Sequence, residues 1–354
     1  MKLAALHELG DLFSGKLPRF LTRTHADPNA GGYLPVFTFH TLEPDDFDAK
    51  LTHLARNGYH TLTLDAAVEH VRGGRPAPAK SVVLTIDDGR LSTWTVGQPL
   101  LRRHNLVATA FIIPGYTDEG APRPALGEPG FTPLDEVADR QTFCNWAEVE
   151  AMHRGGHMQI ESHTTLHRRV LTAATAGAVL QPGYTNNRYL IPSPVAAAAP
   201  WPADAPQSRV GTPMQPARPL LAVDAAFDPP DGPVTEGATW HANAIDTDAA
   251  QRWELVTARR LIEQRLPGKV VRHFCYPESL GTARSLRHVE DAGYASACWG
   301  THDARVANRP GGDPLRLGRL KHDYIPCLPG AGRVPLPRIL WLKAARRLSE
   351  RTGF

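Results

Sequence analysis

The segment SVVLTIDDGR, residues 81–90, decides the fold, because a mostly apolar run ends directly in two adjacent aspartates and a glycine. Residues 81–86 have the β-branched composition that is typical of a buried strand. In folds built from parallel strands and helices, functional residues collect at the carboxyl ends of the strands. Asp87 and Asp88 are therefore candidate site residues, although Asp-Asp-Gly is also an ordinary turn sequence.

Apolar runs of this kind alternate with amphipathic stretches along most of the chain. The predicted strands are residues 33–40, 59–64, 81–86, 107–115, 157–163, 270–277, 294–300 and 314–322. The predicted helices are residues 45–58, 65–74, 96–105, 145–156, 247–266 and 282–293, with Asn145 as the N-cap of the fourth. This alternation predicts an α/β protein, and about seven strands favour a closed or nearly closed βα barrel. An open doubly wound sheet is the alternative.

Composition divides the chain into three parts. Residues 33–330 form the predicted barrel, preceded by an N-terminal extension, residues 1–32. Residues 171–245 are dense in alanine and proline, which suit neither a helix nor a strand interior, so they are predicted to be an inserted loop region. Residues 331–354 form a basic C-terminal helix or tail.

Charge and cysteine content exclude several classes of protein. The 354 residues carry 39 Lys and Arg against 36 Asp and Glu, so no basic stripe for nucleic acid is expected. The four cysteines include no Cys-x-x-Cys pair, which argues against a zinc ribbon or a dense disulfide framework. No apolar run reaches the length of a membrane span, and the N-terminus lacks a secretory apolar region, so we expect a cytoplasmic protein without a membrane span.

A second polar motif, SHTTLH, follows the predicted strand 157–163. His163 and His167 are four residues apart, so both imidazoles can reach one metal ion if the segment makes a helical turn. Asp88 would complete a set of two nitrogens and one oxygen, and a site with three protein ligands leaves a position open for water. Asp87 could then accept a proton from a group that the metal holds.

Taken together, these residues resemble the polysaccharide deacetylase family, the NodB-like group also called carbohydrate esterase family four. The resemblance rests on LTIDDG, residues 84–89, and SHTTLH, residues 162–167, supported by FCYPES and VEDAGYASA further along. It implies a deformed (β/α)7 barrel that carries the alanine- and proline-rich insertion. It also implies a divalent metal, with zinc expected, held by Asp88, His163 and His167, and Asp87 as the general base.

The third motif departs from the family pattern. The resemblance implies that the Tyr276-Pro277 turn and the backbone N–H of Glu278 stabilise the anionic intermediate. Many members carry an arginine that orients the base, but Cys275 occupies the corresponding position here. Arg272 or Arg305 could substitute for it, and Arg272 is the residue that we place at the cleft.

The family also uses a histidine as general acid near its last strand. Two candidates are present, His322 in RLKHDY and His302 in WGTHDA, each followed by an aspartate. We favour His322, because it follows a predicted strand. His40, at the end of the first predicted strand, is a further candidate for the cleft.

These observations predict a metal-dependent hydrolase of carbon–nitrogen bonds. The expected substrate is an N-acetylated carbohydrate, either a polysaccharide or a glycan precursor, from which the enzyme releases acetate. One alternative is a hydrolase of a non-sugar amide on the same fold. Another is a carbohydrate-binding relative with impaired catalysis, suggested by the missing arginine.

Overall fold

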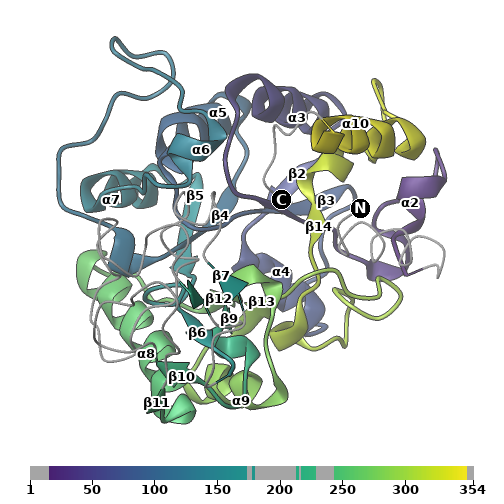
Figure 1. The fold of residues 1–354 in the computed structure, drawn as a ribbon. Helices are drawn as coiled ribbons and strands as arrows, with labels where there is room; N and C mark the ends of the chain where they lie inside the picture. Colours follow the sequence, from purple (N-terminus) through teal and green to yellow (C-terminus); the bar gives the residue numbers. More distant parts are fainter. Residues whose placement is uncertain (1–15, 174–177, 180–212, 215–216, 229–242, 349–354) are drawn as a thin grey trace.

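Parallel strands form the centre of the molecule and helices surround them (Figure 1). The structure, a computed structural model, describes residues 16–173, 178–179, 213–214, 217–228 and 243–348. Its main sheet has the order β13-β12-β5-β4-β3-β1-β14, with β2 paired to β3 off this path. The strands are β1 Val36–Phe39, β2 His60–Leu62, β3 Ser81–Ile86, β4 Ala108–Ile112, β5 Met158–Ser162, β12 His273–Cys275, β13 Ser296–Cys298 and β14 Leu320–Lys321.

The segment that contains β14 connects the two ends of this order. Leu317 forms a parallel bridge with Cys298 of β13, and three residues later Leu320 pairs with Phe37 of β1. The strands therefore return on themselves, and the predicted deformed barrel of parallel strands is confirmed. The open doubly wound sheet is excluded.

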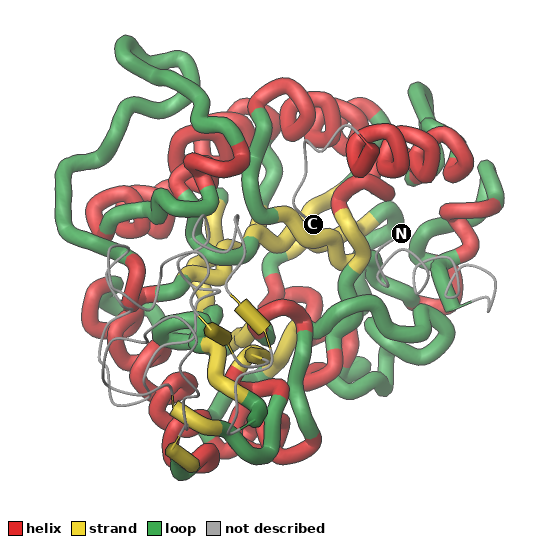
Figure 2. The backbone as a smooth tube through the Cα atoms, viewed as in Figure 1, coloured by secondary structure: helices red, strands yellow, loops and turns green. Residues whose placement is uncertain are grey.

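Helices cover the outside of the sheet (Figure 2). They are α2 Arg19–Thr22, α3 Pro44–Arg56, α4 Leu64–Val71, α5 Gln98–His104, α6 Glu136–Asp139, α7 Trp146–Gly155, α8 Thr247–Arg265, α9 Ala283–Asp291 and α10 Leu336–Leu348. Asn145 caps α7 as predicted, because its side chain accepts a hydrogen bond from Glu148 N–H and Glu148 bonds back to Asn145 N–H. The βα rhythm inferred from the sequence is thus observed.

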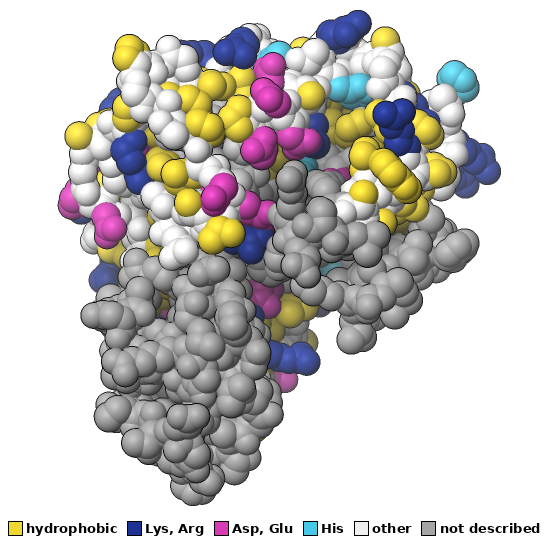
Figure 3. All heavy atoms as spheres, turned by 45° about the horizontal axis from the view of Figure 1, so that its top comes forward, with side chains coloured by type: hydrophobic (Ala, Val, Ile, Leu, Met, Phe, Trp, Pro, Cys, Tyr) yellow, Lys and Arg dark blue, Asp and Glu magenta, His cyan; other side chains and the backbone are white. Residues whose placement is uncertain are grey.

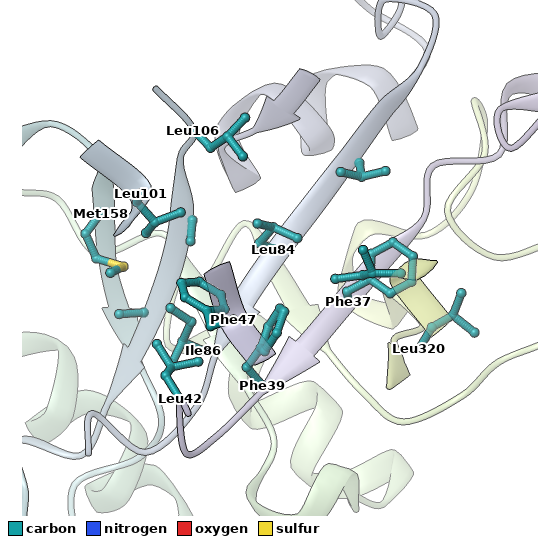
Figure 4. Close-up of a cluster of buried hydrophobic side chains, with 14 of the residues drawn as sticks. Phe37, Phe39, Leu42, Phe47, Leu84, Ile86, Leu101, Leu106, Met158 and Leu320 are labelled. Carbon is teal, nitrogen blue, oxygen red and sulfur yellow. The ribbon is translucent and has the colours of Figure 1, made fainter. Parts of the chain in front are cut away.

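The buried run 81–86 faces two different environments. Leu84 and Ile86 point toward helix α3 and pack in the main core with Phe39 and Phe47 (Figure 4). Val83 points to the other side, where it packs with Phe111 and with residues of α4. All six residues of β3 are buried, since both faces of the strand are covered.

The region predicted as an inserted loop contains short strands. In the described part, β6 Arg169–Leu171, β9 Ala217–Pro219, β10 Phe227–Asp228 and β11 Asn243–Ala244 form an antiparallel sheet, and β7 Ala178–Val179 pairs with β8 Pro213–Met214. The remainder of 171–245, namely 174–177, 180–212, 215–216 and 229–242, lies outside the described residues. Each strand is only two or three residues long, which is too short to give a strand pattern in a sequence dense in alanine and proline. The sequence analysis therefore did not predict these pairings.

The terminal segments contribute to the same core. Phe20 and Leu21 of α2 are fully buried, and Leu336 and Ile339 of α10 are buried with 5% and 6% of their surface exposed. On the face shown in Figure 3, basic side chains are scattered among acidic and apolar ones. Among the described residues, no helix combines the length and apolarity that crossing a bilayer would demand.

Candidate metal centre and active site

Two aspartates lie at the carboxyl end of β3, where the chain turns sharply. Asp88 and Gly89 both adopt left-handed backbone conformations, with φ of 74° and 67°. A side chain at position 89 would place its Cβ 3.0 Å from Ile112 Cγ2, so the turn requires glycine. The turn folds Arg90 back over the carboxylate of Asp88, and both aspartates are almost completely buried.

Arg90 fixes the orientation of Asp88. Its Nε and Nη2 donate to Asp88 Oδ2 at 2.9 and 2.6 Å, and its Nη1 donates to Thr41 Oγ1 at 2.8 Å. The other carboxylate oxygen, Oδ1, lies 3.4 Å from Nε2 of His163. Asp88 therefore presents one oxygen to the histidines while the second is held by a buried guanidinium. The sequence analysis did not single out Arg90, and the only signal for it was its position beside the aspartates.

His163, directly after β5, has its ring orientation set by a carbonyl group. Its Nδ1 lies 2.8 Å from Cys275 O, and because a carbonyl oxygen can only accept, Nδ1 donates. Nε2 is left to face Asp88 Oδ1. A histidine whose other nitrogen donates to a backbone carbonyl is the arrangement typical of a metal ligand.

His167 completes a group of three possible ligands. Ligand atoms of Asp88, His163 and His167 all lie within 4.8 Å of one another, and the three residues are buried. The SHTTLH segment achieves this through left-handed conformations at Thr164 and His167, with φ of 66° and 48°, rather than through the helical turn assumed from the spacing. Two imidazole nitrogens and one carboxylate oxygen form a donor set that fits zinc.

The electrostatics differ among the three residues. Burial raises the pKa of Asp88, but Arg90 and His163 outweigh burial and hold it well below its ordinary value. Burial lowers the pKa of His163, yet Cys275 and Asp88 outweigh it, so the pKa lies well above the usual value. Burial and the charge of His163 lower the pKa of His167 to about 3, which keeps its ring neutral. The donors are thus in the state that binds a cation, except for one proton on His163.

Asp87 is held by an arginine that the sequence analysis missed. Arg319 Nη1 donates to Asp87 Oδ1 at 2.7 Å, and both side chains are 2% exposed. Burial raises the pKa of Asp87, but Arg319 above all outweighs burial and leaves it below its ordinary value. Arg319 lies in the segment that closes the barrel, 232 residues from Asp87, and no local motif marks it.

The two arginines proposed for this position lie elsewhere. Arg272 precedes β12, is half exposed and approaches Asp65 at 3.8 Å, so it does not line the cleft with Asp87. Arg305 is 65% exposed and pairs with Asp303. Cys275, which replaces the family arginine in sequence, has its Sγ 3.7 Å from Asp87 Oδ2, but burial raises the pKa of its thiol to about 11. A protonated thiol is a poor metal ligand.

The structure places the candidate general acids in different surroundings. The ring of His322 stacks on Phe39, with centroids 4.7 Å apart, and lies near Asp46 of α3, so it is on the helix-facing side of β1. His302 lies against the Trp299 ring. His40 does meet the carboxylates: its Nε2 is 3.7 Å from Asp87 Oδ2, and its side chain is 49% exposed. The structure thus brings His40, rather than His322, to Asp87.

The turn after β12 is only partly available to a substrate. The Tyr276 ring is buried between Phe274 and Trp299, so its side chain belongs to the core. The short helix η8, Pro277–Ser279, contains two left-handed residues, Glu278 and Ser279. Tyr276 N–H donates to Cys298 O and Ser279 N–H to Tyr276 O, which leaves the N–H of Glu278 as the remaining donor of this turn. The Glu278 carboxylate pairs with Arg169, two residues beyond His167.

Comparison with known proteins agrees with this geometry. Residues 74–190, which include both motifs, match the family model described as polysaccharide deacetylase. The poly-β-1,6-N-acetyl-D-glucosamine N-deacetylase of Escherichia coli (strain K12) is 33% identical over 136 residues, which are 38% of this chain and only 19% of that relative. The predicted resemblance to this family is confirmed.

Solved structures confirm the fold over a longer range. The BpsB deacetylase domain from Bordetella bronchiseptica has a TM-score of 0.55 and 18% identity, and the match covers 84% of this chain and 98% of that one. IcaB from Ammonifex degensii has a TM-score of 0.53 and 18% identity, with 85% and 95% covered. The barrel is therefore a NodB-like deacetylase fold.

Proposed function

We propose that this chain, whose residues 74–190 match the polysaccharide deacetylase family, is a metal-dependent hydrolase that removes N-acetyl groups from an amino-sugar polymer. The observation that carries the proposal is that the aspartates after β3 and the histidines after β5 converge on one place. The possible ligands Asp88, His163 and His167 lie within 4.8 Å of one another. Beside them, Asp87 is held by Arg319.

The metal is proposed to be zinc. A divalent cation bound there would supply Lewis-acid chemistry that activates water and polarises the acetyl carbonyl. Asp88 would hold it through Oδ1, because Oδ2 already accepts two hydrogen bonds from Arg90. The proton on His163 would leave as the cation enters, so that metal binding and deprotonation are coupled.

Asp87 is the proposed general base. Its pKa lies below the ordinary value, so it is ionised at neutral pH and can accept the proton of the attacking water. Arg319 and Thr38 hold its two oxygens at 2.7 and 3.3 Å, which fixes the direction in which it accepts. The N–H of Glu278 is proposed to stabilise the negative charge that develops on the acetyl oxygen.

His40 is the proposed general acid, in place of His322. It lies 3.7 Å from Asp87 and is half exposed, so a substrate nitrogen can approach it from solvent. Protonation of the departing amine would then occur on the side of the site that opens outward. The stacking of His322 on Phe39 is better explained as packing.

The proposed substrate is a chain of N-acetylglucosamine residues. The supporting fact is the name of the E. coli relative, which acts on poly-β-1,6-N-acetyl-D-glucosamine, although the match spans only 19% of it. The missing family arginine had suggested an impaired, carbohydrate-binding relative. Because Arg319 now occupies the place beside Asp87, that alternative loses its motive.

The test is acetate release from β-1,6-linked N-acetylglucosamine oligomers, together with metal analysis. We expect about one zinc or similar ion per chain and activity that chelation abolishes. Asp87→Asn should lower kcat by about 10²- to 10⁴-fold while the metal content stays the same. A purified wild-type protein that holds no metal and releases no acetate from any N-acetylated glycan would refute the proposal.

A further inference from the structure

The loop that carries His167 is attached to a helix from a distant part of the chain. Residues 165–168 meet Glu254 in the middle of α8, which begins only after the inserted region. Thr165 donates to the backbone carbonyl of Glu254 twice, from its N–H at 3.1 Å and from Oγ1 at 2.8 Å. The loop is thus fixed to α8 just before His167.

The side chain of Glu254 holds the loop on both sides of His167. Its Oε2 accepts the N–H of Leu166 at 2.9 Å, and its Oε1 accepts Nε of Arg168 at 3.0 Å. Glu254 and Arg168 have side chains 1% and 0% exposed, so this ion pair is completely buried. A buried charge pair keeps its geometry because breaking it would leave a charge without compensation.

His167 needs such support because its own backbone conformation is unfavourable. Its φ of 48° is left-handed, as is that of Thr164, and neither residue is glycine. Such conformations persist only where the surroundings impose them. The contacts of Glu254 are with the two residues that flank His167, so they hold the chain on both sides of it.

We propose that Glu254 is a positioning residue for the metal centre: it holds His167 in the orientation that lets its ring share one cation with Asp88 and His163. The inference rests on the metal site of the proposed function and adds to it. It assigns α8 a role in metal affinity, although no residue of this helix is a ligand in the proposed site. Loss of the contact should weaken metal binding in protein that remains folded.

The decisive variant is Glu254→Gln, which keeps the size of the side chain. Both carboxylate oxygens face donors, Leu166 N–H and Arg168 Nε, so the amide NH₂ of glutamine must face one of them. One of the two hydrogen bonds between residue 254 and the loop is then lost. The matched control is Glu263→Gln on the same helix, since Glu263 also accepts from an arginine, Arg259, and from a backbone N–H, that of Val271, at a distance from the loop.

Dissociation constants for Zn²⁺, by chelator competition, and the absorption spectrum of bound Co²⁺ are measured on full-length protein, together with thermal unfolding. We expect Glu254→Gln to weaken Zn²⁺ binding by about 10- to 100-fold and to alter the Co²⁺ spectrum, and Glu263→Gln to do neither. Thr165→Val, which removes one hydroxyl contact, should weaken binding by a smaller factor and provides a second variant if the first does not fold.

The outcomes separate this inference from the proposed function. Wild-type protein that binds neither ion would overturn the metal site and this inference with it. Tight binding by wild type and equally tight binding by folded Glu254→Gln and Thr165→Val would overturn this inference alone. A fall in unfolding temperature without a change in metal affinity would mean that Glu254 has only a structural role, which also contradicts the inference.

Discussion

Glu161 and His163, on β5 and directly after it, and His273 and Cys275 on β12 are pairs of residues two positions apart, and they define two levels of the structure. The upper level contains His163 and Cys275, beside the aspartates at the end of β3. The lower level contains Glu161 and His273, about 7 Å nearer the start of the strands, since each residue advances about 3.3 Å. Both levels contain buried carboxylates, histidine and bound cationic groups, yet they are built differently.

At the lower level, both carboxylate oxygens of Glu161 and both ring nitrogens of His273 have hydrogen-bond or ion-pair partners. Glu161 Oε2 accepts the N–H groups of Arg272 and His273 at 2.9 and 2.8 Å, and Oε1 accepts Lys269. His273 contacts Ser296 Oγ through Nδ1 at 2.8 Å and Asp65 through Nε2 at 3.2 Å. Such a network joins strands and stabilises the fold.

At the upper level the partners instead direct atoms toward one point. Arg90 binds one side of Asp88, and the Cys275 carbonyl binds one side of His163. The remaining atoms of these two proposed ligands, Oδ1 and Nε2, face each other at 3.4 Å. The difference shows that burial and charge do not by themselves mark a functional site. What distinguishes the site is that several donor atoms converge on a single position.

The largest expected effect distinguishes the two histidines that are candidates for the general acid. His40→Ala should lower kcat by about 10³-fold with metal content unchanged, because a general acid contributes about 10²- to 10⁴-fold. His322→Ala, which removes a ring that stacks on Phe39 and lies near Asp46, should retain kcat within about threefold. Steady-state acetate release by the two variants is the measurement, and equal losses in both would contradict the assignment.

Glu161→Gln breaks the lower level. The variant leaves Lys269 beside an uncharged group, and we expect the free energy of unfolding to fall by about 3 kcal/mol, since removal of one partner of a buried ion pair costs about 3 to 5 kcal/mol. Urea unfolding of metal-free protein measures this. The Zn²⁺ affinity of the folded variant should equal that of wild type, and a tenfold loss of affinity would show that the two levels are not independent.

Arg319→Met tests the cation that holds Asp87, the proposed general base. The variant keeps an apolar side chain in the closing segment but removes the donor to Asp87 Oδ1, so kcat should fall by about 10²-fold, the cost of a misplaced catalytic group. Arg272→Met is the matched control, because Arg272 is half exposed and lies near Asp65. It should change kcat by less than about twofold, and a larger effect would restore Arg272 to the cleft.

The smallest effect concerns acid stability at the lower level. The hydrogen bond with His273 lowers the pKa of Asp65, against a smaller contribution from burial. A carboxyl group with a lowered pKa stabilises the folded state above its unfolded pKa of about 3.9, and this stabilisation is lost as the pH falls through the folded pKa. Asp65→Asn should therefore destabilise the protein at pH 6 by less than about 1 kcal/mol, because Asp65 is half exposed, and by less still at pH 3. A difference from wild type that grows toward low pH would have the wrong sign.

Local sequence was sufficient for residues whose role follows from their neighbours. LTIDDG and SHTTLH were recognisable because a buried strand, a turn and its polar residues are adjacent in the chain. Arg319 and Glu254 were not recognisable, because an arginine near the last strand or a glutamate inside a helix resembles any other. Their partners lie 232 and 88 residues away. The same limit explains the assignments of Arg272 and His322, because the sequence does not give the direction in which either side chain points.

The sequence by itself therefore determined the parallel barrel, the family resemblance and four polar residues at two strand ends, because periodicity and short motifs are local properties. Only the tertiary structure decided which oxygen of Asp88 faces His163, which arginine holds Asp87 and which helix fixes the His167 loop. The physical reason is that these contacts depend on two long-range arrangements. Barrel closure brings residues 317–321 beside β1, and α8, which follows the inserted region in sequence, packs against the loop that carries His167. Neither arrangement has a counterpart in any short stretch of the chain.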